Sequence, residues 1–482
     1  MQKIKGMKMM KNRLCYLIPI FFVCMLVSGC RLIHVDEQKM PEATQQEVEM
    51  AMSKYLPKES APIYLNSPKK QAIIRKDLDG DGVSEGVTIF TKENQPGKYE
   101  ILIIKRNQKR QWEKWNQFSL QAKRLSLVGL KDVTHDRRPE LILTVQKDQA
   151  KQESLVVYQL QAHKARLLLN RTYDEKVIDD FQRDGTYEIV LFQVQRDLKR
   201  KVVQTRAELF NYRGKSLVVI DRQQLEGEAK KGNIHSGKVS PQTRGIYVDL
   251  AVGSRGGGTT VLLIPKKSVL LQKIDPGRGL YSYKLINESS RDINRDGILE
   301  FVLMEQPKGT EKMPATQLPY VYNWYQWENG RGRNLVQQTY EDLNFGFRLQ
   351  YLDRWLGKVK VETDRRMNQV TFYYGLVNQP IKKEWKLFIL KRYHQNEWNK
   401  QLQAAAKGKQ QNQPVLLKKS GAFVYAAILP TAQERARFKK IKQQQLIPTK
   451  EELSKQLVLL TKKELKNKLA HRAKVMSKHK QQ

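Results

Sequence analysis

The residues with the clearest chemical potential are acidic side chains that recur in a fixed pattern four times along the chain. Each copy has Asp at positions 1 and 5 and Glu at position 9, directly before an apolar run; the copies begin at Asp77, Asp132, Asp180 and Asp292. Carboxylates and amides at positions 1, 3, 5 and 9 of a tight turn, with the backbone carbonyl of position 7, are hard oxygen ligands of the kind that Ca²⁺ prefers. The pattern therefore predicts oxygen-rich turns, each followed by a β-strand.

Two of the copies supply this ligand set in full. The glycine at position 6 of both permits a sharp reversal of the chain. An EF-hand is excluded, because position 12 of the first copy is Thr88, inside a strand-like run, where an EF-hand needs a bidentate Glu. The predicted ligands of the first copy are Asp77, Asp79, Asp81, the carbonyl of Val83 and Glu85, and those of the last copy are Asp292, Asn294, Asp296, the carbonyl of Ile298 and Glu300.

The two middle copies depart from the pattern. Gln182 replaces a carboxylate in the third copy, while in the second Arg137 replaces the glycine and Pro139 precedes the Glu. We therefore expect plain turns at these two positions. For all four copies a turn without metal stays open as an alternative, because Asp and Asn also stabilise tight turns by accepting hydrogen bonds from nearby backbone amides.

The spacing of the copies predicts a repeated β architecture. Consecutive copies begin 55, 48 and 112 residues apart, and the last interval equals two periods. A decayed copy is therefore expected near residue 238, where the turn residues and the apolar run persist without the acidic positions. Periods of about 40 to 50 residues with several short strands are typical of propeller blades, because one unit cannot bury its own apolar face. We predict a mainly β, propeller-like array of about five four-stranded blades.

At these turns the chain resembles the FG-GAP or VCBS repeat, the Asp-x-Asp-x-Asp-Gly-x-x-Asp/Glu calcium turn of integrin-like β-propellers. The resemblance is closest to VCBS-repeat lipoproteins of Gram-positive bacteria and covers roughly residues 60–340. It implies structural Ca²⁺ in the turns that begin at Asp77 and Asp292. The family usually has six or seven blades, whereas only five starts, clear or decayed, are found in this chain.

The N-terminus has the layout of a secretory signal. Cations precede an apolar run at 14–27, which is shorter than the roughly 20 residues of a membrane-spanning helix. Val27-Ser28-Gly29-Cys30 resembles the bacterial lipobox, which implies cleavage before Cys30 and attachment of diacylglycerol to its sulfur. An uncleaved signal anchor is the alternative, and either version places the rest of the chain outside the cytoplasm. The other two cysteines lie within the signal, so the mature chain has no pair for an intramolecular disulfide.

The chain divides into five predicted segments. They are a lipoprotein signal peptide at 1–29, a tether at 30–60, the repeats at 61–339, an α+β domain at 340–465 and a basic helical tail at 466–482. Alternating strand-like runs and one helical segment predict the α+β domain. The lysine-rich tail predicts a fraying or solvated end, with binding to an anionic surface as the functional alternative.

The charge of the chain is strongly basic. It carries 87 Lys and Arg against 49 Asp and Glu, a formal net charge of +38. Such a field attracts polyanions in a salt-sensitive way. Anionic lipid head groups and teichoic acids are the expected partners at the outer face of the cytoplasmic membrane. Nucleic acid is not expected, because helix-turn-helix, zinc-finger and RNP-type motifs are missing from the sequence. A surface that only serves solubility is the alternative.

The sequence offers no catalytic constellation. The seven histidines are scattered, and the sequence has neither a His-Glu-x-x-His pair nor a Gly-x-Ser-x-Gly elbow. We therefore predict that the chain is not an enzyme but a lipid-anchored envelope protein with a binding or assembly role. A lipid-anchored envelope hydrolase with its site on the blade loops is the alternative. A solute-binding subunit is disfavoured, because few helices are predicted before residue 395.

Overall fold

The computed structural model describes the chain from Glu42 onward, with gaps. The described residues are 42–63, 71–147, 150–197, 199, 202–252, 256–264, 272–274, 288–314, 317–328, 332–376, 379–406 and 413–477. The predicted signal peptide, the predicted lipidation residue Cys30 and much of the tether lie outside these residues.

Six antiparallel sheets and five α-helices make up the described part of the chain. The first five sheets follow one another in chain order, and consecutive strands pair as a meander in sheets 2 to 5, whereas in sheet 1 the first two strands both pair with the third. Sheet 1 holds β1 (Ser60–Pro62), β2 (Ile73–Lys76), β3 (Glu85–Lys92), β4 (Lys98–Arg106) and β5 (Trp112–Gln121); sheet 2 holds β6 (Arg124–Lys131), β7 (Glu140–Gln146), β8 (Glu153–Gln161) and β9 (Lys164–Tyr173). The prediction of a mainly β chain built from four-stranded units is thereby confirmed.

The next three sheets continue the series. Sheet 3 holds β10 (Glu175–Asp179), β11 (Glu188–Asp197), β12 (Val202–Arg213) and β13 (Ser216–Glu226). Sheet 4 holds β14 (Glu228–Lys238), β15 (Arg244–Val252), β16 (Gly256–Leu263) and β17 (Gln272–Ile274). Sheet 5 holds β18 (Phe301–Glu305), β19 (Tyr320–Glu328), β20 (Gly332–Asp342) and β21 (Phe347–Gln350), with β27 (Leu457–Leu459) added at its edge. Sheet 4 stands where the decayed copy was expected.

Consecutive sheets share a hydrophobic core. In β3, Val87 points into the core between sheets 1 and 2, whereas Phe90 points the other way. In β7, Leu141 joins that same core, and its neighbour Ile142 joins the core between sheets 2 and 3. Sheets 3 and 4, and sheets 4 and 5, share cores in the same way. Because successive side chains of a strand face opposite sides, a strand that is buried on both faces has a continuous apolar sequence.

The face of sheet 1 that is turned away from sheet 2 is covered by helix α1 (Gln45–Ser53). The helix begins with a capping box, in which Thr44 and Glu47 exchange side-chain to backbone hydrogen bonds. Val48 of the helix and Phe90 of β3 both belong to this core. A Cβ at Gly86 would lie 2.6 Å from Cγ1 of Val48, so glycine is needed for the helix to approach the sheet this closely.

The sixth sheet belongs to an α+β unit that shares a hydrophobic core with sheet 5. It holds β22 (Val359–Asp364), β23 (Gln369–Tyr374), β24 (Lys386–His394), β25 (Val415–Ser420) and β26 (Phe423–Ile428), accompanied by α2 (Gln395–Ala406), α3 (Ala432–Lys440), α4 (Lys450–Gln456) and the short 3₁₀ turns η2 (Asp353–Trp355), η3 (Lys383–Trp385) and η4 (Gln444–Leu446). The change from sheet 5 to sheet 6 lies between 350 and 359, later than the expected boundary at 340, which falls inside β20.

The chain then returns to sheet 5. After β27 has paired with β21, helix α5 (Lys462–Ser477) follows and contains much of the predicted basic tail. Lys468 of this helix binds Glu341 of β20 at 2.7 Å. Arg472 is 4% exposed and donates to the backbone oxygen of Leu318 at 2.7 Å. These two cations therefore fix the helix to the protein and are not free to bind an external surface.

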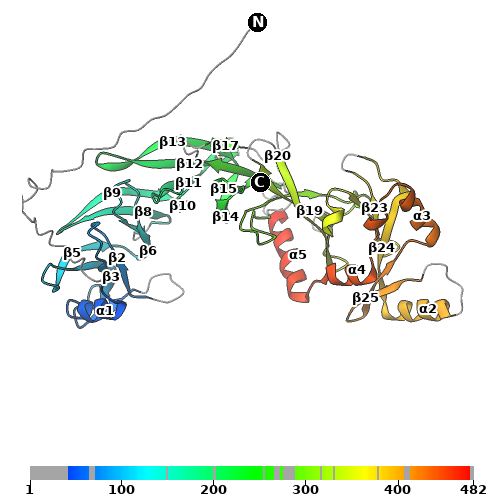
Figure 1. Cartoon of the computed structure of the whole chain (residues 1–482), viewed down its shortest axis with the longest axis horizontal. Coiled ribbons are helices and arrows are strands. Elements are labelled where there is room, and N and C mark those ends of the chain that lie inside the picture. The colour runs from blue at the N-terminus through cyan, green and yellow to red at the C-terminus, as the bar shows by residue number, and fades with distance from the viewer. Residues whose placement is uncertain are drawn as a thin grey trace, which may run out of the picture.

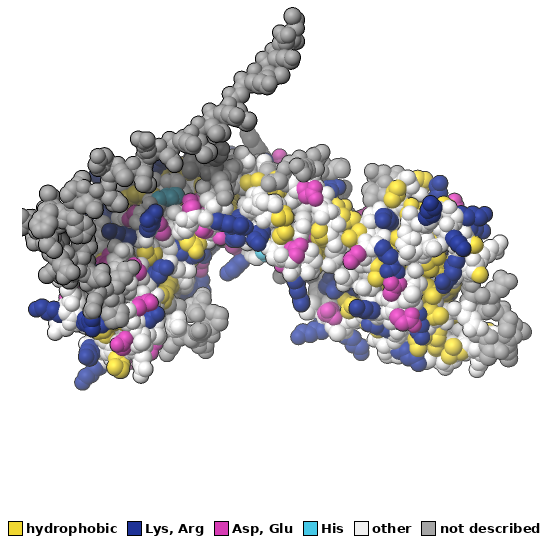
Figure 2. Space-filling view, in the orientation of Figure 1, with side chains coloured by type: hydrophobic (Ala, Val, Ile, Leu, Met, Phe, Trp, Pro, Cys, Tyr) yellow, Lys and Arg dark blue, Asp and Glu magenta, His cyan; other side chains and the backbone are white. Residues whose placement is uncertain are grey.

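Figure 1 shows how the sheets succeed one another along the long axis of the molecule. Helix α1 and sheet 1 lie at one end, and the α+β unit with β24 and α2 lies at the other. Sheets 1 and 5 are far apart along this axis, so the described sheets form an open row. Figure 2 shows that the molecule is hollowed on one side, between sheet 1 and the α+β unit.

Candidate functional site

The four acidic turns occupy equivalent places in their sheets. The first turn joins β2 to β3, the middle turns join β6 to β7 and β10 to β11, and the last turn leads into β18 from Arg291, which forms a β-bridge with Glu300. In each case the Glu at position 9 begins the following strand or directly precedes it. Each Glu is buried: Glu85 and Glu300 are 0% exposed, Glu140 is 1% exposed and Glu188 is 7% exposed. The repeated sequence pattern therefore corresponds to a repeated turn in the structure.

One hydrogen-bond frame recurs in all four turns. Oε2 of the Glu at position 9 accepts a bond from the backbone N–H of position 2, at 2.7 Å in the first turn and 2.8 Å in the last. The corresponding distances for Glu140 and Glu188 are 2.9 Å and 3.1 Å. This bond closes the turn against the start of the second strand, and it explains why a Glu is buried there.

The aspartates complete the frame. The Asp at position 1 accepts from the backbone N–H of position 6, as Asp77 does from Gly82 at 2.9 Å and Asp292 from Gly297 at 2.9 Å. The Asp at position 5 accepts from position 7 in every copy, at 2.8 to 2.9 Å. All these bonds join side chains to backbone groups of the same turn, which is how Asp and Asn residues stabilise tight turns in general.

Burial shifts the ionisation of the four glutamates. It raises the pKa of Glu85 to about 8, and the nearby carboxylate of Asp79 adds to this effect. Burial likewise raises the pKa values of Glu140, Glu188 and Glu300 to about 7. Removing a carboxylate from water disfavours its charged form, and neighbouring negative charges disfavour it further. Each turn thus holds a buried carboxyl group whose ionised form would be stabilised by a nearby positive charge.

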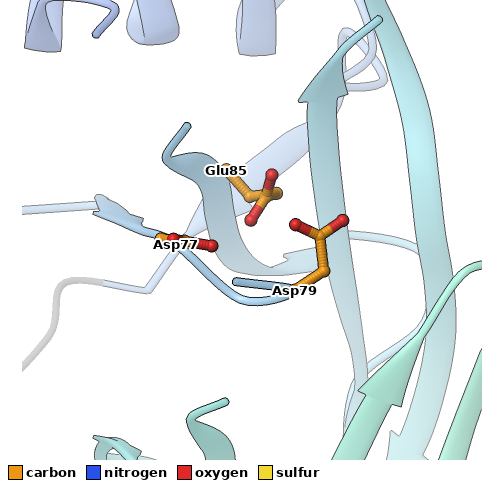
Figure 3. Close-up of side chains that lie close together, drawn as sticks. All are labelled: Asp77, Asp79 and Glu85. Carbon is orange, nitrogen blue, oxygen red and sulfur yellow. The ribbon is translucent and has the colours of Figure 1, made fainter. Parts of the chain in front are cut away.

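Two of the turns bring carboxylates together as the sequence predicts. One oxygen each from Asp77, Asp79 and Glu85 lie within 4.8 Å of one another, and so do oxygens from Asp292, Asp296 and Glu300; they form the two groups of this kind among the described residues. Figure 3 shows the first group, whose three carboxylates surround a common space. The residue types and separations suit a small hard cation.

The other predicted ligands take part in the same turns. The carboxylate of Asp81 accepts from the N–H of Val83 at 2.8 Å. Asn294 donates through Nδ2 to Asp296 at 2.9 Å, so its side chain also lies within the last turn. Ile298 donates its N–H to Asp296 at 2.8 Å. These residues therefore belong to the two turns, but the carboxylate of Asp81 is not among the three that converge in the first turn.

The structure adds a residue that the sequence pattern did not indicate. In sheet 1, Gly86 pairs with Ile104, which places Lys105 of β4 opposite Glu85. Nζ of Lys105 is bonded to the carboxylate of Asp79, lies 2.6 Å from Oδ2 of Asp81 and lies 3.9 Å from Oε1 of Glu85. An ammonium group therefore stands among the carboxylates of the first turn.

Amides stand at the same position in other sheets. Gln326 of β19 lies opposite Glu300, because Phe301 pairs with Tyr325, and its Nε2 donates to Asp296 at 2.6 Å and to Glu300 at 2.8 Å. In sheet 2, Gln159 donates to Asp136 at 3.3 Å. Since these amides lie 19 and 26 residues after the Glu of their turns, only a pairing register could have identified them from the sequence.

A cavity of about 550 Å³ lies beside the last turn, on the face of sheet 5 that is turned away from sheet 4. Its lining includes the guanidinium of Arg291, which lies 4.5 Å from the ring centre of Trp324 and 3.5 Å from a carboxylate oxygen of Glu288. Glu341 also lines the cavity and is paired with Arg348 at 2.9 Å. These four charged groups are therefore already paired with one another.

Comparisons with known proteins do not place the chain in a family. No family model matches it, and no curated protein matches it. Among solved structures, a fructofuranosidase from Schwanniomyces occidentalis complexed with fructosylnystose is 10% identical, covers 69% of this chain and 71% of its own, and has a TM-score of 0.21. A glycoside hydrolase is 9% identical, covers 61% of this chain and 94% of its own, and has a TM-score of 0.15.

These structures require one correction. The prediction that the chain is not an enzyme is contradicted by them, since both are carbohydrate-cleaving enzymes by name, and that prediction is withdrawn. At TM-scores of 0.21 and 0.15 the likeness carries no argument for a shared fold, substrate or mechanism.

The lengths and apolar character of the helices bear on whether any of them could span a membrane. Within the part of the chain that the structure describes, none of them meets both conditions.

Proposed function

We propose that this chain is a lipid-anchored protein of the bacterial envelope, whose five consecutive sheets form an open VCBS or FG-GAP type array that serves as a binding or assembly scaffold. The four acidic turns support the repeat assignment, because the same Glu and Asp hydrogen bonds recur in each. The lipobox-like Val27-Ser28-Gly29-Cys30 supports the anchor.

The observation that carries the scaffold role is the sharing of a core by every consecutive pair of sheets. Sheets 1 to 4 are therefore packed on both faces, with α1 closing the face of sheet 1 that is turned away from sheet 2. Repeats that contact only their neighbours give extended surfaces, and capped ends keep such arrays from associating further. A capped, elongated array projecting from a membrane suits the display of a large binding surface.

Its charge favours anionic polymers as ligands. Figure 2 shows Lys and Arg side chains spread over the visible face rather than gathered in one pocket. At the junction of sheets 2 and 3, Arg171, Arg206 and Arg222 all contact the buried carboxylate of Glu208, at 2.9, 3.3 and 3.1 Å. Three cations around one anion leave an excess of positive charge, with Arg222 the most exposed at 59%.

Binding of a purified glycerol-phosphate teichoic acid to the full chain in detergent tests this proposal. The affinity is expected to fall about tenfold or more between low and high salt, because exposed charges are screened. Arg222→Gln is expected to weaken binding several-fold, and more than the control Arg213→Gln on the same sheet. Salt-independent binding, or no binding, would contradict the proposal, and release of polymer fragments would show that the bound polymer is also a substrate.

We also propose a structural Ca²⁺ in the last acidic turn, held by Asp292, Asp296 and Glu300 with the carbonyl of Ile298. The neutral amides of Asn294 and Gln326 that now donate to these carboxylates can rotate to present their oxygens to a cation. These donors therefore fit the ion. Its role would be to stiffen the turn between the fourth and fifth sheets.

Removal of Ca²⁺ by a chelator is expected to lower the melting temperature by about 2–4 °C, since an ion that binds only the folded state stabilises it. Asp296→Asn is expected to abolish this difference. Asp184→Asn is the matched control, because Asp184 makes the same bond to its turn, to Thr186 at 2.9 Å, without a candidate ion. A chelator effect that survives in Asp296→Asn would rule out the last turn as the site.

A further inference from the structure

The first acidic turn differs from the last in the charge of the residue opposite its Glu. In the first turn that residue is Lys105, whose side chain is 17% exposed and whose Nζ contacts Asp79 and Asp81. In the last turn it is Gln326, which donates to Asp296 and Glu300. The strand register makes the two positions equivalent, since each side chain lies opposite the Glu at position 9, on the strand that pairs with the strand following the turn.

The chemistry of the two side chains leads to opposite outcomes for a metal ion. The amide of Gln326 has an NH₂ group and a carbonyl oxygen. Rotation about its last side-chain torsion replaces the NH₂ donor by the oxygen, which can bind a metal ion. The ammonium of Lys105 has three donors and no acceptor, and it carries the same sign of charge as a metal ion. A divalent cation can enter the first turn only if Lys105 leaves the carboxylates that it now contacts.

The first turn nevertheless keeps three converging carboxylates. Asp77, Asp79 and Glu85 converge within 4.8 Å, and Figure 3 shows them facing a common space. Glu85 is 0% exposed, and its Oε1 has no hydrogen-bond partner; its contact with Nζ of Lys105 is 3.9 Å long. A buried carboxylate oxygen of this kind is costly unless a cation lies near it.

From this geometry we infer that Lys105 serves as an internal cation in place of a metal in the first turn, and that this turn is a latent divalent-cation site. The ammonium neutralises the carboxylates that the repeat pattern places there, so the turn is stable without an added ion. Removal of the ammonium opens the site to Ca²⁺. The claim about Lys105 is independent of the Ca²⁺ proposed for the last turn, whereas the reciprocal claim about Gln326 rests on it.

A reciprocal exchange tests the inference. Lys105→Gln gives the first turn the side chain of the last, and Gln326→Lys gives the last turn the side chain of the first. Calorimetric titration with Ca²⁺ measures the number of ions bound by the full chain in detergent. We expect one ion for the wild type, two for Lys105→Gln and none for Gln326→Lys. Lys105→Arg, which keeps the cation, is the matched control and is expected to bind as the wild type does.

Melting with and without Ca²⁺ provides the second measurement. Lys105→Gln is expected to melt below the wild type in chelator and to recover most of the loss in Ca²⁺, and circular dichroism reports whether it folds. A folded Lys105→Gln that binds no additional ion overturns the inference. If the variant stays unfolded in both conditions, undiminished Ca²⁺ binding by Gln326→Lys overturns it and loss of binding supports it.

The outcome for the wild type separates the two proposals. A wild type that binds no Ca²⁺, together with a Lys105→Gln variant that binds one ion, would refute the proposed site in the last turn and uphold the role of Lys105. A wild type that binds one ion, together with a folded Lys105→Gln variant that also binds one, would uphold the proposed site in the last turn and refute the role of Lys105.

Discussion

Replacement of Glu341 by Ala is expected to destabilise the protein by about 3–5 kcal/mol and to release helix α5 from sheet 5. Glu341 is 1% exposed and contacts Arg348 at 2.9 Å, Lys468 at 2.7 Å and the guanidinium of Arg472 at 3.9 Å. Burial opposes its charge, but the cations of Lys468 and Arg348 outweigh burial and hold the pKa of Glu341 below its usual value. Removal of one member of a buried ion network leaves the others uncompensated, which costs about this much.

Urea unfolding measures the loss of stability, and hydrogen exchange across 462–477 measures the release of the helix. Glu328→Ala is the control, because Glu328 lies exposed on β19 of the same sheet and is expected to change stability by less than about 0.5 kcal/mol. Unchanged exchange in α5 of the Glu341 variant would show that contacts other than those of Glu341 hold the helix, such as the bond from Arg472 to Leu318.

The sequence was most informative where structure is local. The turn that begins at Asp77 and the strand that begins at Glu85 follow from nine consecutive residues, because the Asp and Glu side chains bind backbone groups within the same turn. The decayed copy near 238 could also be placed, since the apolar run of β15 persists without the acidic residues. Local hydrogen bonding and the alternating burial of a strand both depend on a few consecutive residues, so both can be predicted from short segments of sequence.

Contacts between distant segments could not be predicted in this way. Lys105 enters the first turn from another strand, and its position depends on the pairing register of β3 and β4. Helix α5 is fixed by Lys468 to Glu341, a residue 127 positions earlier, so its basic composition alone indicated a solvated tail. The boundary expected at 340 missed the end of sheet 5 because β20 and β21 continue the meander past that residue.

The buried glutamates of the turns are expected to make stability fall as the pH rises. Burial raises the pKa of Glu188 from 4.5 to about 7 in the folded state. Its stabilising contribution is therefore fully present below pH 4.5 and is lost as the pH rises through 7, because the folded state binds the proton more tightly than the unfolded state. A shift of this size corresponds to a contribution on the order of 3 kcal/mol.

Glu188→Gln isolates this contribution. The amide oxygen of Gln can accept the N–H of Phe181 as Oε2 of Glu188 does at 3.1 Å, and the amide does not ionise. Between pH 5 and pH 8, the wild type is expected to lose more unfolding free energy than Glu188→Gln, by roughly 3 kcal/mol. Glu93→Gln, at an exposed position, is expected to follow the wild type. Carboxylates with a lowered pKa, such as Glu341, make stability rise with pH. The test therefore depends on the difference between the wild type and Glu188→Gln in how unfolding free energy changes with pH. Parallel curves for the wild type and Glu188→Gln would show that Glu188 stays ionised in the fold.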